Sequence, residues 1–155
     1  MGRRLTWFYK GQEINSEEDL PKDKKYIGFI YLITQKSSGK KYIGRKLLHK
    51  TKYVTVNKKK KKVMVQSDWL TYYSSSPVIN EHIEQHGTDD FGREILTFVS
   101  SKGNMVYCEE LALYTVGALE QPDLWLNENI RAKVYRNWVK VDEVQNLRDM
   151  IKKIS

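Results

Sequence analysis

Residues 27–44 read IGFIYLITQKSSGKKYIG. The first part, Ile27–Thr34, is a short apolar run rich in β-branched and aromatic residues, and Lys40–Gly44 is a second β-prone stretch. Residues 35–39 between them (QKSSG) have the composition of a turn. Two such runs around a short glycine-containing loop predict a β-hairpin.

Outside this hairpin the pattern predicts one more good strand and three helices. Residues 91–99 contain EILTFV, which predicts a third strand. Ser76-Pro77 is typical of a helix start with proline at the first position, and Gly87 would end that helix after His86.

Two further helices are predicted from apolar spacing. In the first, Asn104 is a candidate cap, and the apolar positions recur at spacings of 3, 4, 4 and 3, namely Met105, Cys108, Ala112, Val116 and Leu119. In the second, at the C-terminus, they recur at 3, 4 and 3, namely Val144, Leu147, Ile151 and Ile154. The sequence therefore predicts an α+β domain, in which helices flank a small antiparallel sheet of about three strands.

The segment after the hairpin carries a lysine run. Tyr53–Val56 and Val63–Val65 are short β-prone pieces, and five consecutive lysines, Lys58–Lys62, lie between them. We expect a second, more flexible hairpin with these lysines at its tip, because like charges resist compact structure. The expected organisation is an N-terminal extension that packs loosely (1–25), a main domain (26–137) with a lysine-rich insertion (47–66), and a C-terminal amphipathic helix (138–155).

The charge of the chain is concentrated in one third of it. The 155 residues carry a formal net charge of +8. From Leu20 to Lys62 there are fifteen Lys or Arg and one acid, Asp23, a net charge of +14, whereas the rest has twelve bases and eighteen acids, a net charge of −6. This distribution predicts a polyanion as the binding partner.

Several classes of protein are excluded by composition. No apolar run approaches the roughly 20 residues that cross a bilayer, and no apolar stretch of secretory-signal type follows the N-terminal arginines. Cys108 is the single cysteine, so neither an internal disulfide nor a zinc cluster is expected. These features predict a cytosolic protein.

The predicted hairpin carries residues that resemble a known family. Its first strand reads Gly28-Phe29-Ile30-Tyr31 and its second reads Tyr42-Ile43-Gly44, which resembles the GIY-YIG nucleases, with one extra residue in the first motif. The stretches Asp68–Ser75 and Ile83–Leu96, a later Glu and a later Asn follow in the order found in phage-borne members. The resemblance covers about residues 26–135 and implies a DNA endonuclease of phage or mobile-element type, acting in the cytoplasm of a bacterial cell.

The resemblance implies one hard cation, Mg²⁺ or Mn²⁺, held by a single helix Glu with water and phosphate oxygens. We assign this role to Glu109, with Glu110 as the alternative. Glu109 follows Cys108 and flanks the apolar face of its helix, whereas Glu110 points about 100° further round. Mg²⁺ keeps most of its waters and accepts few carboxylates, which suits such a site.

The motif tyrosines are the implied partners of the attacking water. By resemblance, Tyr31 is expected to be the general base and Tyr42 to orient water or phosphate. A phenol titrates near 10, so a base role requires a nearby cation or metal-bound water. Asn127 resembles the family's late Asn, which supports the site by hydrogen bonds, and Asn129 is the alternative.

The chain departs from the family in one respect. Members usually carry an Arg on the first helix after the hairpin, but no Lys or Arg occurs between Lys62 and Arg93. Arg45 or Lys46, directly after the second motif, is expected to contact the scissile phosphate instead. His82, on the predicted helix, is a further candidate for the missing cation, and the alternative is an ordinary exposed helix histidine. His49, which follows Arg45 and Lys46 in the chain, is another candidate.

DNA is the expected partner of the basic third. Lysines contact phosphates without reading sequence and make binding depend steeply on salt. The expected contacts are Lys40, Lys41, Lys50, Lys52, Lys58, Lys59, Lys60, Lys61 and Lys62. The other interpretation of the lysine run is a solvated loop. Specificity for a DNA sequence would come from the N-terminal extension, the lysine hairpin or a partner.

Three hypotheses of function follow, and the last of them is an accessory protein whose partner, bound through the C-terminal helix, supplies targeting. The first is a divalent-metal-dependent DNA endonuclease, with the C-terminal helix either folded onto its own domain or forming a homodimer contact. The second is a nucleic-acid-binding protein on a nuclease scaffold that has lost catalysis, which the missing helix Arg would favour.

Overall fold

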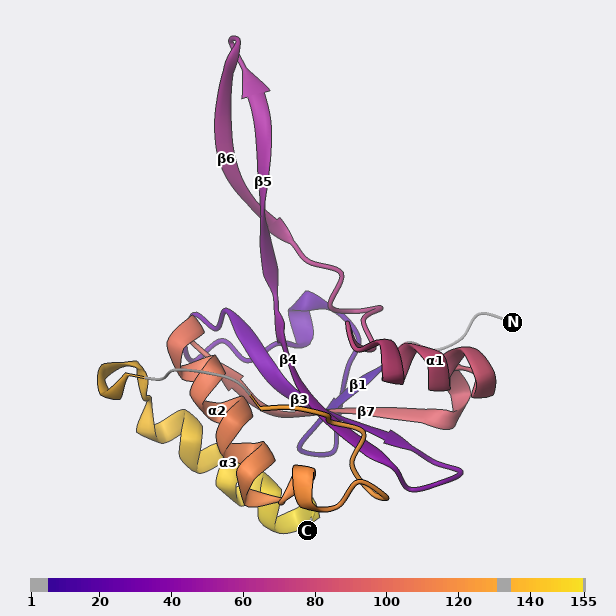
Figure 1. Ribbon diagram of the computed structural model, residues 1–155. Helices are drawn as coiled ribbons and strands as arrows, with labels where there is room; N and C mark the ends of the chain where they lie inside the picture. The colour runs from indigo at the N-terminus through magenta and orange to yellow at the C-terminus, as the bar shows by residue number, and fades with distance from the viewer. Residues whose placement is uncertain (1–5, 131–134, 155) are drawn as a thin grey trace.

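A computed structural model describes residues 6–130 and 135–154. Figure 1 shows a body of one sheet with helices against it, and a long hairpin that projects away from this body. The strands are β1 (Trp7–Tyr9), β2 (Gln12–Ile14), β3 (Gly28–Gln35), β4 (Lys41–Leu47), β5 (His49–Val56), β6 (Lys59–Gln66) and β7 (Phe91–Val99). The helices are α1 (Pro77–His86), α2 (Lys102–Thr115) and α3 (Val141–Ile154), and single 3₁₀ turns cover Glu17–Asp19, Thr88–Asp90, Ala118–Glu120 and Arg136–Trp138.

The body is built on a mixed sheet with the strand order β2-β1-β7-β3-β4. β3 lies near its centre and is buried along almost its whole length, which explains its continuous apolar sequence. It pairs antiparallel with both β4 and β7. The α+β class is confirmed. The sheet has more strands than the three or so that were predicted, because β1 and β2 extend it, and it is mixed because β1 runs parallel to β7.

The N-terminal segment is part of this sheet, which corrects the expectation that it packs loosely. Phe8 pairs with Glu94 of β7, and the Trp7 side chain is fully buried. The Trp7 ring contacts Phe29 and Tyr31 edge-on, and its Nε1 donates to the backbone oxygen of Trp69 at 2.8 Å. Burial of such a large side chain makes this segment a core element rather than a leader.

The helices divide between the two faces of the sheet. α2 and α3 pack on the face formed by Ile30, Leu32 and Ile43. α1 and the segment around Trp69 cover the opposite face. None of the helices in the described ranges has the length and apolar character needed to cross a membrane.

The predicted helices are largely present with their expected bounds. α1 spans Pro77 to His86 as predicted, and Gly87, at φ 80°, follows it. α2 ends at Thr115, earlier than the expected Leu119, and Ser101 rather than Asn104 caps it by accepting a hydrogen bond from the Asn104 N–H. The cap prediction was therefore wrong.

The C-terminal helix folds back onto its own chain. Val144, Leu147, Met150 and Ile151 of α3 are buried in the same cluster as α2 and β7. The apolar face is thus occupied within the monomer, and the expected homodimer contact through this helix is not supported. Of the two uses considered for this helix, the intramolecular one is present.

The lysine-rich segment forms a regular hairpin, with a different arrangement from the one expected. β5 and β6 pair over eight residues each, and the tip is Asn57-Lys58, both with positive φ. Such a two-residue turn suits a hairpin and favours Asn at its first position. Lys59–Lys62 therefore lie within β6 rather than at the tip.

Glu143 of α3 connects four parts of the fold although it is almost fully buried. Its carboxylate accepts hydrogen bonds from the Ser100 N–H and hydroxyl, from Asn104 Nδ2 at 3.0 Å and from Lys24 Nζ at 3.1 Å. Asn104 in turn accepts from the Lys140 N–H at 2.9 Å. A buried carboxylate with this many donors is stable only because each oxygen is satisfied.

We predict that Glu143→Ala lowers the free energy of unfolding by about 3 kcal/mol, because it leaves buried donors without an acceptor. Urea unfolding of the purified variant measures this. Asp142→Ala is the control, since Asp142 also pairs with Lys24 but is exposed, and it should cost less than about 1 kcal/mol. Equal losses in the two variants would contradict the assigned role of Glu143.

Candidate active site

The two motif tyrosines lie side by side on the sheet face that carries Trp69. Tyr31 of β3 stands opposite Gly44 of β4, and Tyr42 stands opposite Ile33. The Tyr31 and Tyr42 ring centroids are 6.3 Å apart. The antiparallel register thus brings together two residues that are eleven positions apart in the sequence.

Gly44 is required by this arrangement because the Tyr31 ring lies directly over it. A Cβ at position 44 would lie 2.3 Å from Tyr31 Oη, closer than real Cβ atoms approach other heavy atoms. The glycine of the second tripeptide therefore makes room for the tyrosine of the first. This packing explains why two short motifs on neighbouring strands form one unit.

Ser74, which precedes α1, lies beside the side chains of both tyrosines. The Tyr31 ring contacts the Tyr72 ring, with centroids 5.9 Å apart, and Ser76 lies beside Tyr42. Burial raises the pKa of Tyr31 well above its usual value, and the side chain is only 1% exposed. Tyr42 is less buried, and its pKa is also raised, first by burial and further by the nearby Glu109 carboxylate.

Glu109 projects from α2 toward the edge strand β4. Its carboxylate lies 3.9 Å from Arg45 Nε, and its side chain is 25% exposed. Burial raises the pKa of Glu109, and the Arg45 charge opposes this rise. The site therefore combines a partly desolvated carboxylate, a cation and the Tyr42 phenol.

Arg45 and Lys46 point to opposite faces because they are consecutive residues of a strand. Arg45 lies on the α2 face with Glu109 and is partly exposed. Lys46 lies on the tyrosine face, where it pairs with Asp68 at 2.6 Å and stands 3.9 Å above the Tyr72 ring. Arg45 is thus beside the Glu109 carboxylate, whereas Lys46 is held by its own partners.

Asn127 binds the second tripeptide directly. Its Oδ1 accepts from the Ile43 N–H at 3.0 Å, and its Nδ2 donates to the Ile43 carbonyl at 2.8 Å. The Lys41 N–H donates to the Leu124 carbonyl and the Leu126 N–H donates to the Lys41 carbonyl, which continues this contact along the outer edge of β4. The segment 124–127 therefore covers the edge strand as far as Ile43.

The order and geometry of these residues agree with a family model described as "Putative endonuclease segE, GIY-YIG domain", which matches residues 7–130. The chain belongs to the GIY-YIG family. The match begins at β1, earlier than the resemblance seen in the sequence, which is consistent with the place of β1 and β2 in the sheet. Comparison with curated proteins and with solved structures gave no match.

Beyond Ile43, the GIY-YIG strand β4 borders a hollow of about 520 Å³. It lies between the end of β4, the base of the hairpin and the start of α2. Its lining is rich in cations and contains one acid, Asp68; the charged residues and the histidine are Arg45, Lys46, His49, Lys50, Asp68 and Lys102. Such a surface suits a phosphate-bearing ligand.

The donor set of this GIY-YIG site fits a hard cation held largely by water. No group of three or more His, Cys, Asp or Glu that could hold a metal occurs within residues 6–130 and 135–154. Glu109 is the carboxylate nearest to Arg45 and Tyr42 in the contacts described above. A single carboxylate with water and phosphate oxygens is the kind of coordination that Mg²⁺ accepts.

Several predicted residues lie apart from this cluster. His82 stacks on His86 within α1, with ring centroids 6.2 Å apart, and its described contacts do not include the tyrosines or Glu109. Lys41 lies at the far end of β4, where it contacts the Trp125 ring and donates to the Ile154 carbonyl at 3.4 Å. Lys40, the adjacent residue, precedes β4 at that same end. The remaining predicted DNA contacts, Lys50, Lys52 and Lys58–Lys62, lie on the hairpin or its tip.

Ser74, Tyr72 and Asp68 were not assigned a role from the sequence, although they belong to the stretch that carries the resemblance. Ser74 is buried against both motif tyrosines, and Asp68 and Tyr72 hold Lys46. Nothing in the local pattern distinguishes these side chains from an ordinary polar loop. Their position is set by the way the segment 67–76 folds over the tyrosine face.

We predict that Gly44→Ala lowers the free energy of unfolding by about 1–3 kcal/mol, because the added methyl group overlaps the Tyr31 ring. Denaturant unfolding measures the loss. Gly92→Ala is the matched control, as Gly92 is also a strand glycine but has no atom within 4 Å of the added Cβ. If both variants unfold at the same denaturant concentration, the Tyr31–Gly44 contact is not the constraint described here.

Proposed function

We propose that the protein is a divalent-metal-dependent DNA endonuclease of phage or mobile-element type, which hydrolyses phosphodiester bonds. The observation that carries this proposal is the position of Glu109, whose partly buried carboxylate lies 3.9 Å from Arg45 Nε and near enough to Tyr42 to raise the pKa of that phenol. Family membership supports a nuclease. The cationic hollow beside the cluster supports a polyanionic substrate.

In this proposal Glu109 holds the metal, Mg²⁺ or Mn²⁺. The bound cation would act as a Lewis acid on the phosphoryl oxygens and on a bound water. The partly desolvated surroundings of Glu109 make its carboxylate a stronger electrostatic partner than an exposed one. Glu110, one residue further round α2, adds negative charge next to Glu109 and has no other assigned role.

Arg45 and Lys46 are the proposed phosphate contacts. Arg45 stands beside Glu109, so a phosphate bound near that carboxylate would come within reach of a guanidinium that can donate two hydrogen bonds. Lys46 reaches the same hollow from the other face of β4. In this proposal these two cations take the place of the helix Arg that the chain lacks, and His82, which is partly buried on α1, has no phosphate contact.

Tyr42 is better placed than Tyr31 to act on water. Tyr31 is fully enclosed and its pKa is raised by burial, which opposes the base role first expected for it. Tyr42 is less buried and lies near Glu109, where a bound cation would favour its phenolate. We therefore propose that Tyr31 has a structural role, in which its side chain packs against Gly44 and Ser74. Tyr42 is proposed to orient or deprotonate the attacking water.

Asn127 is proposed as a positioning residue. Its two hydrogen bonds to Ile43 fix the backbone between Tyr42 and Gly44. These bonds restrict the backbone next to Tyr42 and thereby help to fix the position of its side chain. Asn129, the alternative from the sequence, has no described contact that does the same among residues 6–130 and 135–154.

The metal assignment predicts that Glu109→Gln reduces plasmid nicking in Mg²⁺ or Mn²⁺ by more than about 100-fold, because the amide cannot replace a carboxylate ligand. Gel analysis of supercoiled plasmid measures the loss. Glu110→Gln is the control and should keep activity within about threefold. Nicking that survives Glu109→Gln would contradict the assignment.

If wild-type protein binds plasmid but leaves it intact in either metal, the non-catalytic alternative is correct and the endonuclease proposal fails. Binding by gel shift separates these cases, since it requires neither metal nor cleavage. The same gel shift should give equal affinities for the wild-type protein and for Glu109→Gln.

The tyrosine assignment predicts a larger loss of activity for Tyr42→Phe than for Tyr31→Phe. Removal of a group that acts on the attacking water should cost about 100-fold or more. Loss of a buried hydroxyl that only positions its neighbours should cost about tenfold or less. Single-turnover cleavage rates distinguish the two, and a greater loss for Tyr31→Phe would restore Tyr31 as the base.

A further inference from the structure

The hairpin β5–β6, here called the arm, is detached from the core of the protein. Its two strands pair with each other along their whole length, and neither packs extensively on another element. Figure 1 shows the arm continuing the line of β4 away from the body. At its base, the Leu48 carbonyl accepts a hydrogen bond from the Ser67 N–H, and the Leu48 N–H donates to the Ile27 carbonyl. These backbone bonds attach the base of the arm to the body.

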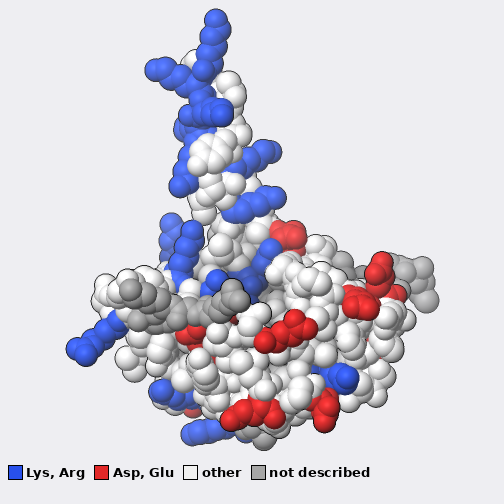
Figure 2. Space-filling view, in the orientation of Figure 1, with Lys and Arg blue, Asp and Glu red and all other residues white. Residues whose placement is uncertain are grey.

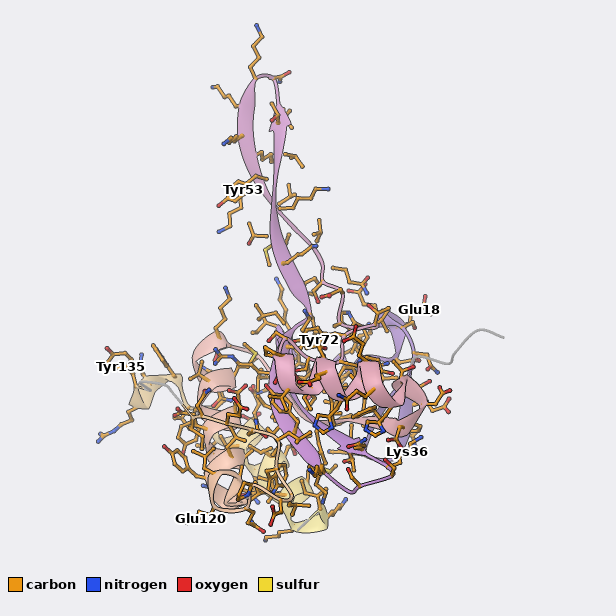
Figure 3. All side chains as sticks on the ribbon, turned by 45° about the vertical axis from the view of Figure 1, so that its right-hand side comes forward. Glu18, Lys36, Tyr53, Tyr72, Glu120 and Tyr135 are labelled. Carbon is orange, nitrogen blue, oxygen red and sulfur yellow. The ribbon has the colours of Figure 1, made fainter. Side chains whose placement is uncertain are left out.

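A free two-stranded hairpin is costly to maintain in water. Its strands have exposed edges and neither face packs extensively on the body, and isolated hairpins are marginally stable. The arm also exposes large side chains, with Tyr53 65% and Met64 64% exposed. Figure 3 shows Tyr53 on the arm, well clear of the body. These features are typical of a surface that is completed by a ligand.

The charge of the arm identifies the class of ligand. Residues 49–66 contain seven lysines and no acid. In Figure 2 the arm is lined with basic side chains up to its tip, whereas the acidic side chains lie on the body. A strand pair with this charge is complementary to a nucleic-acid backbone.

The two faces of the arm differ in chemistry. Directly opposite residues of β5 and β6 share a face, so alternate residues define each side. One face carries valines and lysines, namely Val54, Val56, Val63, Val65, Lys50, Lys52, Lys59 and Lys61. The other carries hydroxyl groups and a thioether as well as lysines, namely Thr51, Tyr53, Thr55, Met64, Lys60 and Lys62.

We propose that the arm is a DNA-reading β-ribbon that enters the major groove of duplex DNA, with Thr51, Tyr53 and Thr55 facing the base edges. The major groove has the width of a two-stranded ribbon, and ribbons are an established way of reading it. Hydroxyl groups both donate and accept hydrogen bonds, as base recognition requires, whereas valine does neither. The lysines on both faces contact the flanking phosphates.

The tip of the arm favours the major groove over the minor one. Proteins that kink DNA from the minor groove insert an apolar wedge between base pairs. The arm instead ends in Asn57-Lys58, a tight polar turn. The tip therefore lacks a side chain that could unstack bases.

The arm and the catalytic cluster share one continuous edge of the protein, because β5 follows β4 after the single residue Leu48. Tyr53 lies eight residues beyond Arg45, up to about 26 Å away along an extended chain. This inference rests on the proposed nuclease function, and it deepens that function by separating recognition from cleavage. The bases that are read would then lie up to about eight base pairs from the bond that is cut.

Selection from a random duplex pool tests the reading role without requiring cleavage. The full-length Glu109→Gln protein is used without metal, so that bound DNA stays intact. We expect it to enrich a shared motif of no more than about eight base pairs, and methylation of guanine N7 within that motif to block binding, since N7 lies in the major groove. A pool with no shared motif, or binding that tolerates N7 methylation, would overturn the proposal.

Two double variants of β5 separate the faces of the arm. Tyr53→Ala with Thr55→Ala should weaken binding to the selected duplex about 10- to 100-fold and leave binding to unrelated duplex unchanged, as lost base contacts do. Val54→Ala with Val56→Ala removes similar β-propensity from the other face and should change either affinity by less than about threefold. Equal effects of the two variants would overturn the assignment of the reading face.

The lysines of the arm are tested by charge-matched variants. Replacement of Lys58–Lys62 by Gln should lower the slope of log affinity against log salt concentration by up to about 4.5. The control replaces five exposed lysines of the body, namely Lys22, Lys36, Lys140, Lys152 and Lys153. The same slope change in the control, or equal binding to duplex RNA or to phosphatidylserine vesicles, would contradict recognition of DNA by the arm.

The outcomes for the arm and for catalysis are separable. If Glu109→Gln selects a motif but wild-type protein never nicks DNA, the endonuclease proposal fails and the arm proposal stands. If wild-type protein nicks DNA without regard to any motif, the reverse holds.

Discussion

The contact between the Tyr31 ring and Gly44 is the constraint on which the active region depends. It fixes the register of β3 against β4, since a slip by one residue would place a side chain where only a hydrogen atom fits. With the register fixed, Tyr42 lies next to Tyr31, and Ser74 lies beside both side chains. The same register turns Arg45 to the opposite face, where α2 presents Glu109. The two faces of one edge strand thereby contribute to one cluster.

The outer edge of β4 has two parts, one covered by another segment of the chain and one that borders the cationic hollow. Up to Ile43, its outer side is occupied by the segment 124–127, which prevents pairing with another chain. From Arg45 onward, the strand borders the cationic hollow instead. Asn127 marks the boundary between these two parts, and its contact with Ile43 explains how a late residue can support a site built by an early hairpin.

Much of the framework could be predicted because its signals are local. Pro77 and Gly87 bound α1, and the apolar spacing around Cys108 placed Glu109 beside the packed face of α2. β1 was not predicted because it has three residues and is held by parallel pairing with β7, 86 positions away. The sequence predicts Asn104 as the cap of α2, but its side chain donates a hydrogen bond to Glu143 of α3 instead. No local pattern reveals such a long-range partner.

The site shows the same division. The proximity of Tyr31 and Tyr42 and the place of Glu109 on α2 could be predicted from motif and periodicity, whereas the difference in burial between the two tyrosines could not. The difference in burial between them is produced by Tyr72, Ser74 and the loop over that face, which only the folded chain brings into place. The lysines of β6 lacked an alternating pattern and so resembled a loop, although pairing with β5 orders them.

Leu48 has a consequence for how such a protein can change. Its backbone is bonded to Ile27 and Ser67, so the chain is fastened to the body at both ends of the arm. We therefore expect insertions, deletions or exchanges in the arm beyond Leu48 and Ser67 to leave the register of β3 and β4 unaltered. Under the proposed roles, remodelling the arm would change which DNA is recognised without changing the residues proposed for cleavage.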